Sequence, residues 1–184
     1  MIIGITGKIA SGKSSLSSVF VKKGYYLFDS DLQYHKLLKN NISMKSELIK
    51  VFSNEIVDNN EINTKLLLKK INRNNINKLN EITHKYVAKE IYKVIKLHDN
   101  VVIEAAIPIN KGFIDVCDLI LLTVCDENIQ RQRLLERKKY NVNEIDNLIA
   151  IQQKNSEYIK ISDYVIETNK LTIEELNNTI NLLF

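Results

Sequence analysis

The chain has 184 residues and a formal net charge of +4, with 45% hydrophobic and 26% charged residues. These values fit one globular domain and exclude a disordered chain, a collagen-like chain and a small scaffold held together by disulfides. The Lys residues are scattered among Asn and Ile, which favours a solvated surface over a stripe that binds nucleic acid.

The first 31 residues have the pattern of a strand–helix–strand unit. Residues 2–6 form a short apolar run with β-branched side chains, which predicts a buried strand. Residues 13–23 carry apolar side chains at helical spacing before Gly24, and residues 25–28 predict a second strand. Two strands joined by a helix are parallel, so this segment indicates an α/β fold.

Residues 32–99 are mostly helical in pattern. The spacing of their apolar residues predicts helices over residues 32–38, 45–52, 64–71 and 77–97. The polar stretch 53–63 predicts a loop. We therefore expect an all-helical insertion at one end of the sheet.

The sheet pattern resumes after residue 100. Strands are predicted at residues 101–103, 119–124 and 164–166, and helices at 127–139, 142–159 and 173–183. Five strands that alternate with helices predict an α/β fold with a five-stranded parallel sheet flanked by helices. We expect one domain over residues 1–184, because no repeat or Pro-rich linker interrupts the chain.

The strongest motif lies between the first predicted strand and the first predicted helix. It reads Gly7-Lys8-Ile9-Ala10-Ser11-Gly12-Lys13-Ser14, followed by Ser15, and matches G-x-x-x-x-G-K-[ST]. Glycines let backbone N–H groups turn toward an anion, and the N-terminus of the helix adds a positive field. The motif predicts a nucleoside triphosphate site in which Lys13 reaches the phosphates and Ser14 is a Mg²⁺ ligand.

Three acidic residues follow predicted strands. Asp29 and Asp31 end the second strand and Glu104 ends the third, at the edge of an open α/β sheet where ligands bind. Carboxylates there can act as a general base for an attacking hydroxyl or hold a Mg²⁺-bound water. An Asp before residue 32 also suits a helix N-cap, and Glu104 also suits a hydrogen bond to the backbone at a loop edge.

Gln130, Arg133 and Arg137 recur at three- and four-residue steps on one predicted helix, which puts them on one face. Arg side chains grip phosphate oxygens or stack on a purine, although a solvated helix face has the same pattern. His84 stands alone in a helix, and no Cys or His lies near it at the spacing of a zinc site.

With these residues assembled, the chain resembles the dephospho-coenzyme A kinases, a family of P-loop kinases. The resemblance spans nearly the whole chain and rests on residues 3–15, 24–31, 79–84, 101–107, 130–137 and 162–169, and on Gln152. It implies transfer of the γ-phosphoryl group of ATP to the ribose 3′-hydroxyl of dephospho-coenzyme A. It also implies a core (residues 1–31, 100–125 and 161–184), a helical acceptor lobe (32–99) and a small helical lid (126–160).

The resemblance also implies roles for the candidate residues. Residues 7–15 would hold the ATP phosphates and Ser14 the Mg²⁺, for which Glu104 is a second candidate by its position after a strand. Asp31 would be the base and Asp29 would support the site. Arg137 would contact the transferred phosphate, and Arg133 would lie beside the nucleotide. Asn169 would lie near the adenine. His84 and His35 would lie on the acceptor side.

Several positions depart from the family pattern. Lys8 and Ala10 stand where the family commonly has Gly, and His35 stands where it often has Arg. Lys85 stands where the family usually has Pro. Tyr158 stands where the family has a lid Lys, and Lys160 lies nearby. The segment that ends at Asn110 lacks the acidic residue of the family. These changes bear on acceptor contacts more than on ATP binding.

Two other functions remain open at this point: a P-loop kinase of another small acceptor, such as a nucleoside monophosphate, and a nucleotide-dependent switch without kinase activity. A GTPase switch should carry Asn-Lys-x-Asp, and residues 169–172 lack the final Asp. No apolar run of about 18 residues and no export signal occur. We therefore expect a cytoplasmic monomer with reduced Cys117 and Cys125 that binds small molecules, with neither membrane nor nucleic acid as a partner.

Overall fold

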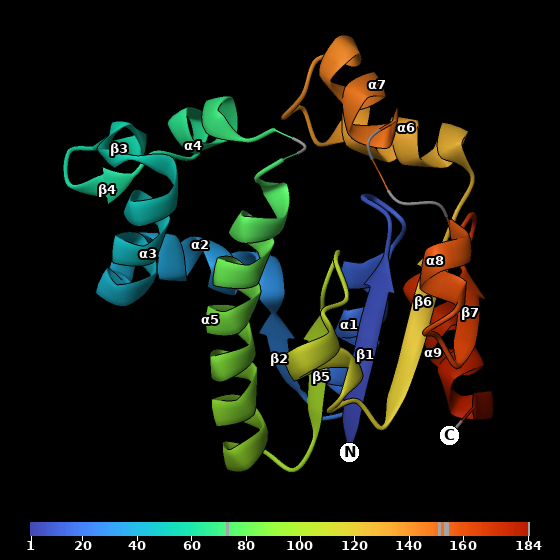
Figure 1. Ribbon diagram of the computed structural model, residues 1–184. Coiled ribbons are helices and arrows are strands. Elements are labelled where there is room, and N and C mark those ends of the chain that lie inside the picture. Colours follow the sequence, from blue (N-terminus) through green and yellow to red (C-terminus); the bar gives the residue numbers. More distant parts are fainter. Residues whose placement is uncertain (73, 151, 153–154, 184) are drawn as a thin grey trace.

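The computed structural model describes residues 1–72, 74–150, 152 and 155–183 (Figure 1). Its main sheet has five parallel strands in the order β2-β5-β1-β6-β7. The strands are β1 (Ile2–Gly7), β2 (Tyr26–Asp29), β5 (Val101–Glu104), β6 (Leu119–Val124) and β7 (Tyr164–Glu167). The predicted α/β fold with a five-stranded parallel sheet is confirmed.

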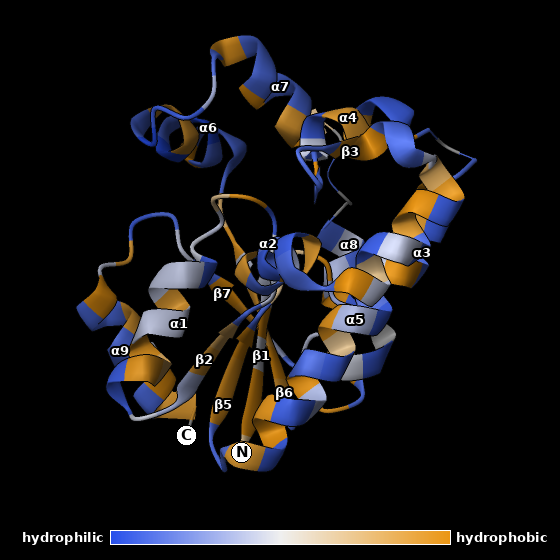
Figure 2. Cartoon of the chain, turned by 90° about the vertical axis from the view of Figure 1, so that its left-hand side faces the viewer, coloured by the Kyte–Doolittle hydropathy of each residue, from blue (hydrophilic) through white to orange (hydrophobic). Residues whose placement is uncertain are grey.

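Helices cover both faces of this sheet, which is why its central strands are continuous apolar runs. Helices α1 (Lys13–Lys22) and α9 (Ile173–Leu183) pack together on one face. Helices α5 (Ile76–Leu97) and α8 (Asn155–Ile159) lie on the other face (Figures 1 and 2). Strand β1 shows the division clearly, because Ile3 and Ile5 are fully buried toward α1.

Gly4 lies between these two isoleucines and faces the opposite layer. A Cβ atom built at Gly4 would come within 2.8 Å of both the Phe113 ring and the Cys117 sulfur. The segment after β5, with the short helical turn η2 (Asn110–Ile114), therefore packs directly on the backbone of β1. No side chain larger than hydrogen fits at residue 4 without moving this layer.

Strand β1 is central, and its two neighbours come from later parts of the chain. The chain passes from β1 through α1 to the edge strand β2, returns as β5 beside β1, and then places β6 on the other side of β1. The order of strands therefore reverses at β1. In open α/β sheets, ligands bind at the carboxyl end of such a switch point, which here is the loop after β1.

The middle of the chain forms a lobe beside the sheet, and one prediction for it was wrong. Helices α2 (Ser30–Asn40), α3 (Ile42–Phe52), α4 (Thr64–Lys70) and α5 lie near the predicted positions. Residues 53–63, predicted as a loop, contain the short 3₁₀ helix η1 (Asn54–Ile56) and an antiparallel hairpin of β3 (Val57–Asp58) and β4 (Glu61–Ile62). Asn59 and Asn60 turn the hairpin with φ of 48° and 64°, a conformation that Asn tolerates better than most residues. The insertion is therefore not all-helical.

The predicted helix over residues 142–159 is also corrected, because the structure has two helices there. Helix α7 (Val142–Ala150) follows α6 (Glu127–Glu136), and α8 begins at Asn155. Ile145 of α7 packs against the loop after β1, whereas Tyr158 of α8 is buried near the sheet. The two apolar faces thus have different partners, and one straight helix does not reach both.

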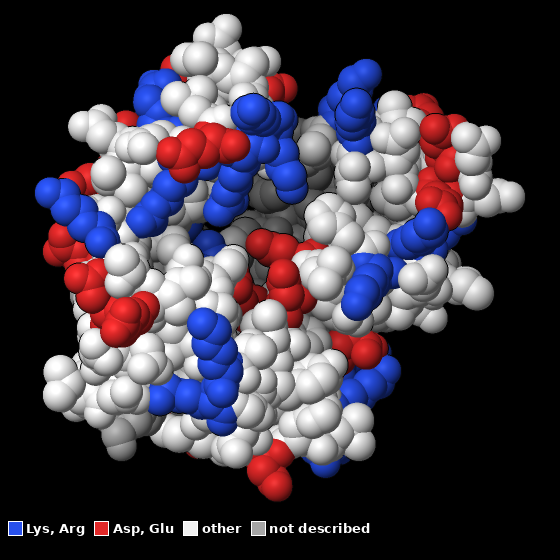
Figure 3. Space-filling view, turned by 180° about the vertical axis from the view of Figure 1, so that it is seen from behind, with Lys and Arg blue, Asp and Glu red and all other residues white. Residues whose placement is uncertain are grey.

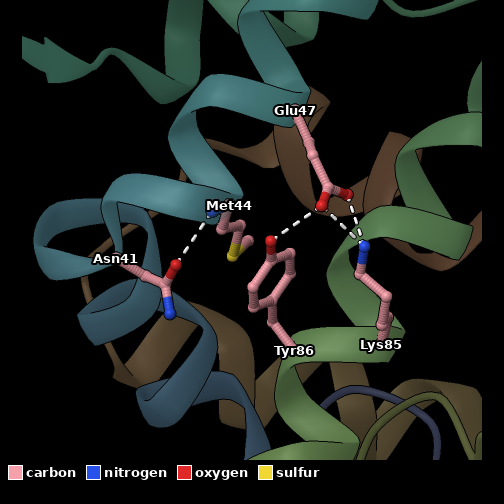
Figure 4. A network of polar contacts seen from close by, with 5 residues as sticks. All are labelled: Asn41, Met44, Glu47, Lys85 and Tyr86. Atoms are coloured by element: carbon pink, nitrogen blue, oxygen red, sulfur yellow. Dashed lines mark hydrogen bonds and ion pairs between the residues drawn. The ribbon is translucent and has the colours of Figure 1, made fainter.

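Apolar packing and a polar network both join α3 to α5 (Figure 4). Glu47 accepts hydrogen bonds from the Tyr86 hydroxyl at 2.8 Å and from the Lys85 ammonium at 2.6 and 2.7 Å. These hydrogen bonds, the one from Lys85 first, lower the pKa of Glu47. Because Glu47 and Lys85 are partly exposed, solvent screening leaves the pair a small role, and the buried apolar residues of α3 hold the lobe.

Leu48→Ala is expected to lower the free energy of unfolding by about 2–5 kcal/mol, because it removes a fully buried side chain from the lobe core. Ile42→Ala on the same helix is the matched control, since Ile42 is 84% exposed, and it should change stability by less than about 0.5 kcal/mol. Urea unfolding of both variants makes the comparison. Equal losses would mean that α3 does not bury Leu48 as described.

No helix within the described residues is long and apolar enough to span a bilayer.

Candidate active site

The loop between β1 and α1 has the geometry of an anion-binding turn. Gly7 and Gly12 have φ of 142° and 97°, and a Cβ at either would lie within 3 Å of neighbouring oxygen atoms. Gly12 is the N-cap residue of α1 and has no side chain to bond the first N–H groups of the helix. Those N–H groups remain available for an anion at the positive end of the helix.

The ammonium of Lys13 lies against the backbone of this loop. Its ammonium donates hydrogen bonds of 3.0 Å to the carbonyl oxygens of Gly7 and Lys8, and the residue is 8% exposed. Burial lowers the pKa of Lys13, while the charges of Glu104 and Asp31 oppose that change. The loop therefore holds a buried cation close to two carboxylates.

A cleft of about 1100 Å³ opens above the loop, and charged side chains of both signs border the hollow (Figure 3). Its walls come from the loop after β1, the ends of β2 and β5, and the segment that follows β6. The residues include all of 7–15 together with Asp29, Asp31, Glu104, Arg133, Arg137, Tyr140, Gln152 and Tyr158. Most of the residues predicted for the donor side thus meet in one cleft.

Asp29 and Glu104 are neighbours in the sheet, because the parallel register of β2 and β5 pairs them. Asp29 caps α2 by accepting a hydrogen bond of 2.9 Å from the backbone N–H of Leu32, so it both caps a helix and lines the cleft. Glu104 accepts hydrogen bonds from Ser14 at 2.8 Å and Ser17 at 2.9 Å. Both oxygens of Glu104 are therefore oriented by hydroxyls of α1.

Asp31, on the first turn of α2, faces the cleft between its walls. Asp31 remains exposed to solvent, and partial desolvation by the walls is the main reason that the pKa of Asp31 is raised. The Lys13 charge acts in the opposite direction, whereas the neighbouring Asp29 adds to the rise. A carboxylate with a raised pKa is a stronger base than one with the ordinary pKa.

We expect the raised pKa of Asp31 to appear in the pH dependence of kcat/KM. A base must be deprotonated, so activity should fall as the pH drops through the pKa of Asp31, above the ordinary value of 3.8. A pH profile of the free enzyme measures this acidic limb, and Asp31→Asn should remove it. An unchanged limb in that variant would assign the titration to another group.

A second pocket of about 260 Å³ adjoins the cleft, with Asp31, Ala106 and Ile107 in the walls of both. Its lining is mainly apolar, with a few polar groups such as Asn80 and His84 from α5. Burial lowers the pKa of His84 and so favours its neutral form. The Ser30 hydroxyl also lines this pocket, and its oxygen is buried without a hydrogen-bond partner among the described residues.

Gln130, Arg133 and Arg137, predicted to share one helix face, have different environments. Arg137 follows the helix and lines the cleft, where its charge contributes to lowering the pKa of Lys13. Arg133 also lines the cleft, but its guanidinium donates to the Ala10 carbonyl at 3.1 Å and to Thr168. Gln130 is buried and bonds the loop after β1.

Some predicted residues lie away from the two pockets as the structure defines them. Asn169 accepts a hydrogen bond from the backbone N–H of Asp126 and donates one to Glu167, and it is absent from both linings. His35 is exposed on α2 beside Tyr34 and also lines neither pocket. The side chain of Asn110 lies outside the described part of the structure.

Several residues of the site were not in the predicted set, among them Ser17, Ser30, Thr168 and Tyr158. Ser17 was detectable, because it lies four residues after Lys13 and so on the same face of α1. Ser30 stands between the two predicted aspartates. Thr168 donates to the carbonyl of Ser11 at 2.6 Å, and Tyr158 donates to the carbonyl of Ala106 at 3.2 Å. These last two contacts join distant segments, and no local pattern predicts them.

Comparison with known proteins identifies the family. A family model described as dephospho-CoA kinase matches residues 1–174. The chain belongs to the dephospho-CoA kinase family. The family predicted from the sequence is thereby confirmed. Curated relatives include the dephospho-CoA kinase of Fusobacterium nucleatum, 37% identical over 96% of this chain and 93% of the relative. That of Buchnera aphidicola is 30% identical over 99% of this chain and 89% of the relative.

Solved structures show that the fold is that of the P-loop kinases. The dephospho-CoA kinase of Campylobacter jejuni superimposes with a TM-score of 0.68 at 17% identity, covering 99% of this chain and 94% of the other. A shikimate kinase from Acinetobacter baumannii has a TM-score of 0.58 at 15% identity, covering 99% and 91%. The predicted fold of the P-loop kinase type is confirmed.

Proposed function

We propose that this chain transfers the γ-phosphoryl group of ATP to the ribose 3′-hydroxyl of dephospho-CoA, the last step of coenzyme A synthesis. The observation that carries this proposal is the position of Asp31, which lines both the large cleft and the adjoining pocket. A base at that junction faces a donor on one side and an acceptor on the other. Family membership supplies the identity of the acceptor.

The large cleft suits a triphosphate. Loop N–H groups, the N-terminus of α1 and the Lys13 ammonium supply positive charge on one side, and Arg137 supplies it from the other. These groups orient the phosphates and neutralise charge that develops during transfer. Arg133 would flank the nucleotide, and Asn169 would lie near the adenine.

The donor side also suits Mg²⁺. Ser14 and Glu104 offer a hydroxyl and a carboxylate, the oxygen ligands that this ion prefers, and their oxygens lie 2.8 Å apart. The described residues contain no group of three or more His, Cys, Asp or Glu side chains that could hold a metal. This fits an ion held by one or two protein oxygens and the substrate phosphates. When bound, Mg²⁺ would neutralise phosphate charge.

The smaller pocket suits the acceptor. Its apolar walls fit a flat ring or aliphatic chain, and Ser30, Asn80 and His84 offer hydrogen bonds to polar edges. Asp31 would accept the proton of the 3′-hydroxyl as the hydroxyl oxygen attacks phosphorus. Asp29 would keep Asp31 in position by capping α2. His35 would contact the more distant part of the acceptor.

Water must be excluded, because otherwise ATP is hydrolysed instead of transferred. We assign this task to the segment 126–160 as a lid over the core, because several of its described residues line one wall of the cleft. Residues 32–99 form the acceptor lobe, and the remainder is the core. We also propose that the enzyme acts in the cytoplasm as a monomer.

An acceptor panel tests the proposal. ADP formation from ATP and Mg²⁺ is measured with dephospho-CoA, with nucleoside monophosphates, with shikimate and with no acceptor. We expect acceptor-dependent ADP formation with dephospho-CoA, at least about 100-fold faster than with the other compounds. Turnover of a nucleoside monophosphate at the higher rate would favour the other kinase class, and ADP formation that ignores acceptors would favour a switch.

A further inference from the structure

The tip of the loop after β1 is held by side chains of the segment that follows β6. The Ile9 N–H donates a hydrogen bond of 2.6 Å to Oε1 of Gln152. The Ile9 carbonyl accepts a hydrogen bond of 2.7 Å from Nε2 of Gln130. Two glutamines therefore bond the two polar groups of one residue in the phosphate-binding loop.

The backbone partners fix which amide atom each glutamine uses. A backbone N–H can only donate, so Gln152 must present its oxygen, and a carbonyl can only accept, so Gln130 must present its nitrogen. The Nε2 atom of Gln152 is buried without a partner among the described residues. Replacing that nitrogen by oxygen loses no hydrogen bond, whereas the same replacement in Gln130 removes the donor when the carboxyl group is ionised.

The loop needs such support because its next residue has an unfavourable conformation. Ala10 has φ of 56°, in the left-handed region that residues with a Cβ rarely adopt. Arg133 donates to the Ala10 carbonyl at 3.1 Å, and Ala10 packs with Leu134 and Ile145. The lid segment thus surrounds the strained turn with hydrogen bonds and apolar contacts.

We propose that Gln130 and Gln152 are positioning residues that clamp Ile9 and thereby fix the direction of the loop N–H groups that receive the ATP phosphates. The clamp sets ATP affinity and leaves acceptor affinity unchanged. It also anchors both ends of the lid segment to one point, since residue 130 lies near its start and residue 152 near its end. This inference rests on the proposed use of ATP.

The test makes the same substitution at both positions. Gln152→Glu keeps an oxygen acceptor for the Ile9 N–H, whereas Gln130→Glu sets a carboxylate against the Ile9 carbonyl. Each variant adds one negative charge beside Ile9, so both variants repel the ATP phosphates. The difference between their Kd values for ATP therefore reports the hydrogen bond to Ile9. We expect Gln130→Glu to weaken ATP binding at least about 10-fold more than Gln152→Glu.

Isothermal titration calorimetry with ATP, without acceptor, gives the Kd of each variant. Gln152→Leu, which has no acceptor, should weaken ATP binding about 10-fold. Steady-state kinetics should show a raised KM for ATP with an unchanged KM for dephospho-CoA. If Gln130→Glu does not fold, as judged by thermal unfolding, Gln130→Met removes the donor without adding charge and should weaken ATP binding about 10-fold.

Equal ATP affinity of the two Glu variants, or wild-type affinity of Gln130→Met, would overturn the clamp. A KM for dephospho-CoA that rises with the KM for ATP would also overturn it, because a general loss of structure affects both substrates. Failure of the proposed function is a separate result. In that case ATP would bind with the predicted pattern of affinities, but no phosphoryl group would reach dephospho-CoA.

Discussion

Lys13→Ala is expected to reduce phosphoryl transfer at least about 1000-fold, the largest effect of any single substitution in this chain. The Lys13 ammonium is a buried cation next to the loop that receives the phosphates, and none of the other described residues that line the cleft bonds the same loop carbonyls through an ammonium. Its loss removes stabilisation of charge on the transferred group, which water in the cleft replaces poorly.

The fold should survive this change. Burial lowers the pKa of Lys13, so the charged form is disfavoured in the folded chain, and loss of the charge offsets part of the loss of the hydrogen bonds to the Gly7 and Lys8 carbonyls. Lys22→Ala, at the exposed end of the same helix, is the matched control and should keep near-normal turnover. Single-turnover kinetics and thermal unfolding of both variants check this prediction, and transfer within 10-fold of wild type in Lys13→Ala would contradict it.

Asp31→Asn is expected to slow transfer by at least about 100-fold while leaving the Kd for ATP within a factor of about three. The amide has nearly the same shape as the carboxylate but cannot accept the proton of the acceptor hydroxyl. Since Asp31 lines both pockets, the loss should appear in kcat and not in nucleotide binding. Rapid-quench measurement of the transfer step gives the rate directly.

The same variant should be slightly more stable than the wild type at neutral pH, because Asp31 is exposed and solvent screening keeps the effect small. A raised pKa means that the folded chain favours protonated Asp31, so this contribution to stability is present at low pH and is lost as the pH rises through the pKa of Asp31. Asn cannot ionise and avoids that loss. Asp99→Asn, in the exposed turn before β5, serves as the control and should change neither rate nor stability. Near-normal transfer in Asp31→Asn would refute its role as the base.

Local pattern was enough to predict the main sheet, because each of its strands is a short apolar run before or after a helix with clear amphipathic spacing. Local pattern failed where polar residues form a turn through their backbone preferences. Asn59 and Asn60 read as loop residues, and only their tolerance of positive φ indicates the hairpin that they form. It also failed to divide α7 from α8, because that boundary depends on which distant surface each helix covers.

The candidate site also contains residues that the sequence predicted and contacts that it did not. Residues 7–15, Asp29, Asp31 and Glu104 were predictable because a motif or a strand end marks them, and the structure brings them to one cleft. The contacts that support the loop were not predictable, although Gln130 and Gln152 had been singled out in the sequence. Gln130, Gln152 and Thr168 act through contacts with backbone groups more than 100 residues away, and such contacts leave no spacing in the sequence.

The most direct test of the account identifies the product. The protein is incubated with ATP, Mg²⁺ and dephospho-CoA, and the product is analysed by mass spectrometry and phosphorus NMR. We predict one added phosphoryl group per acceptor, on the ribose 3′-oxygen, with one ADP formed for each. ADP and free phosphate beside unchanged dephospho-CoA, or a phosphoryl group on another oxygen, would contradict the proposed reaction.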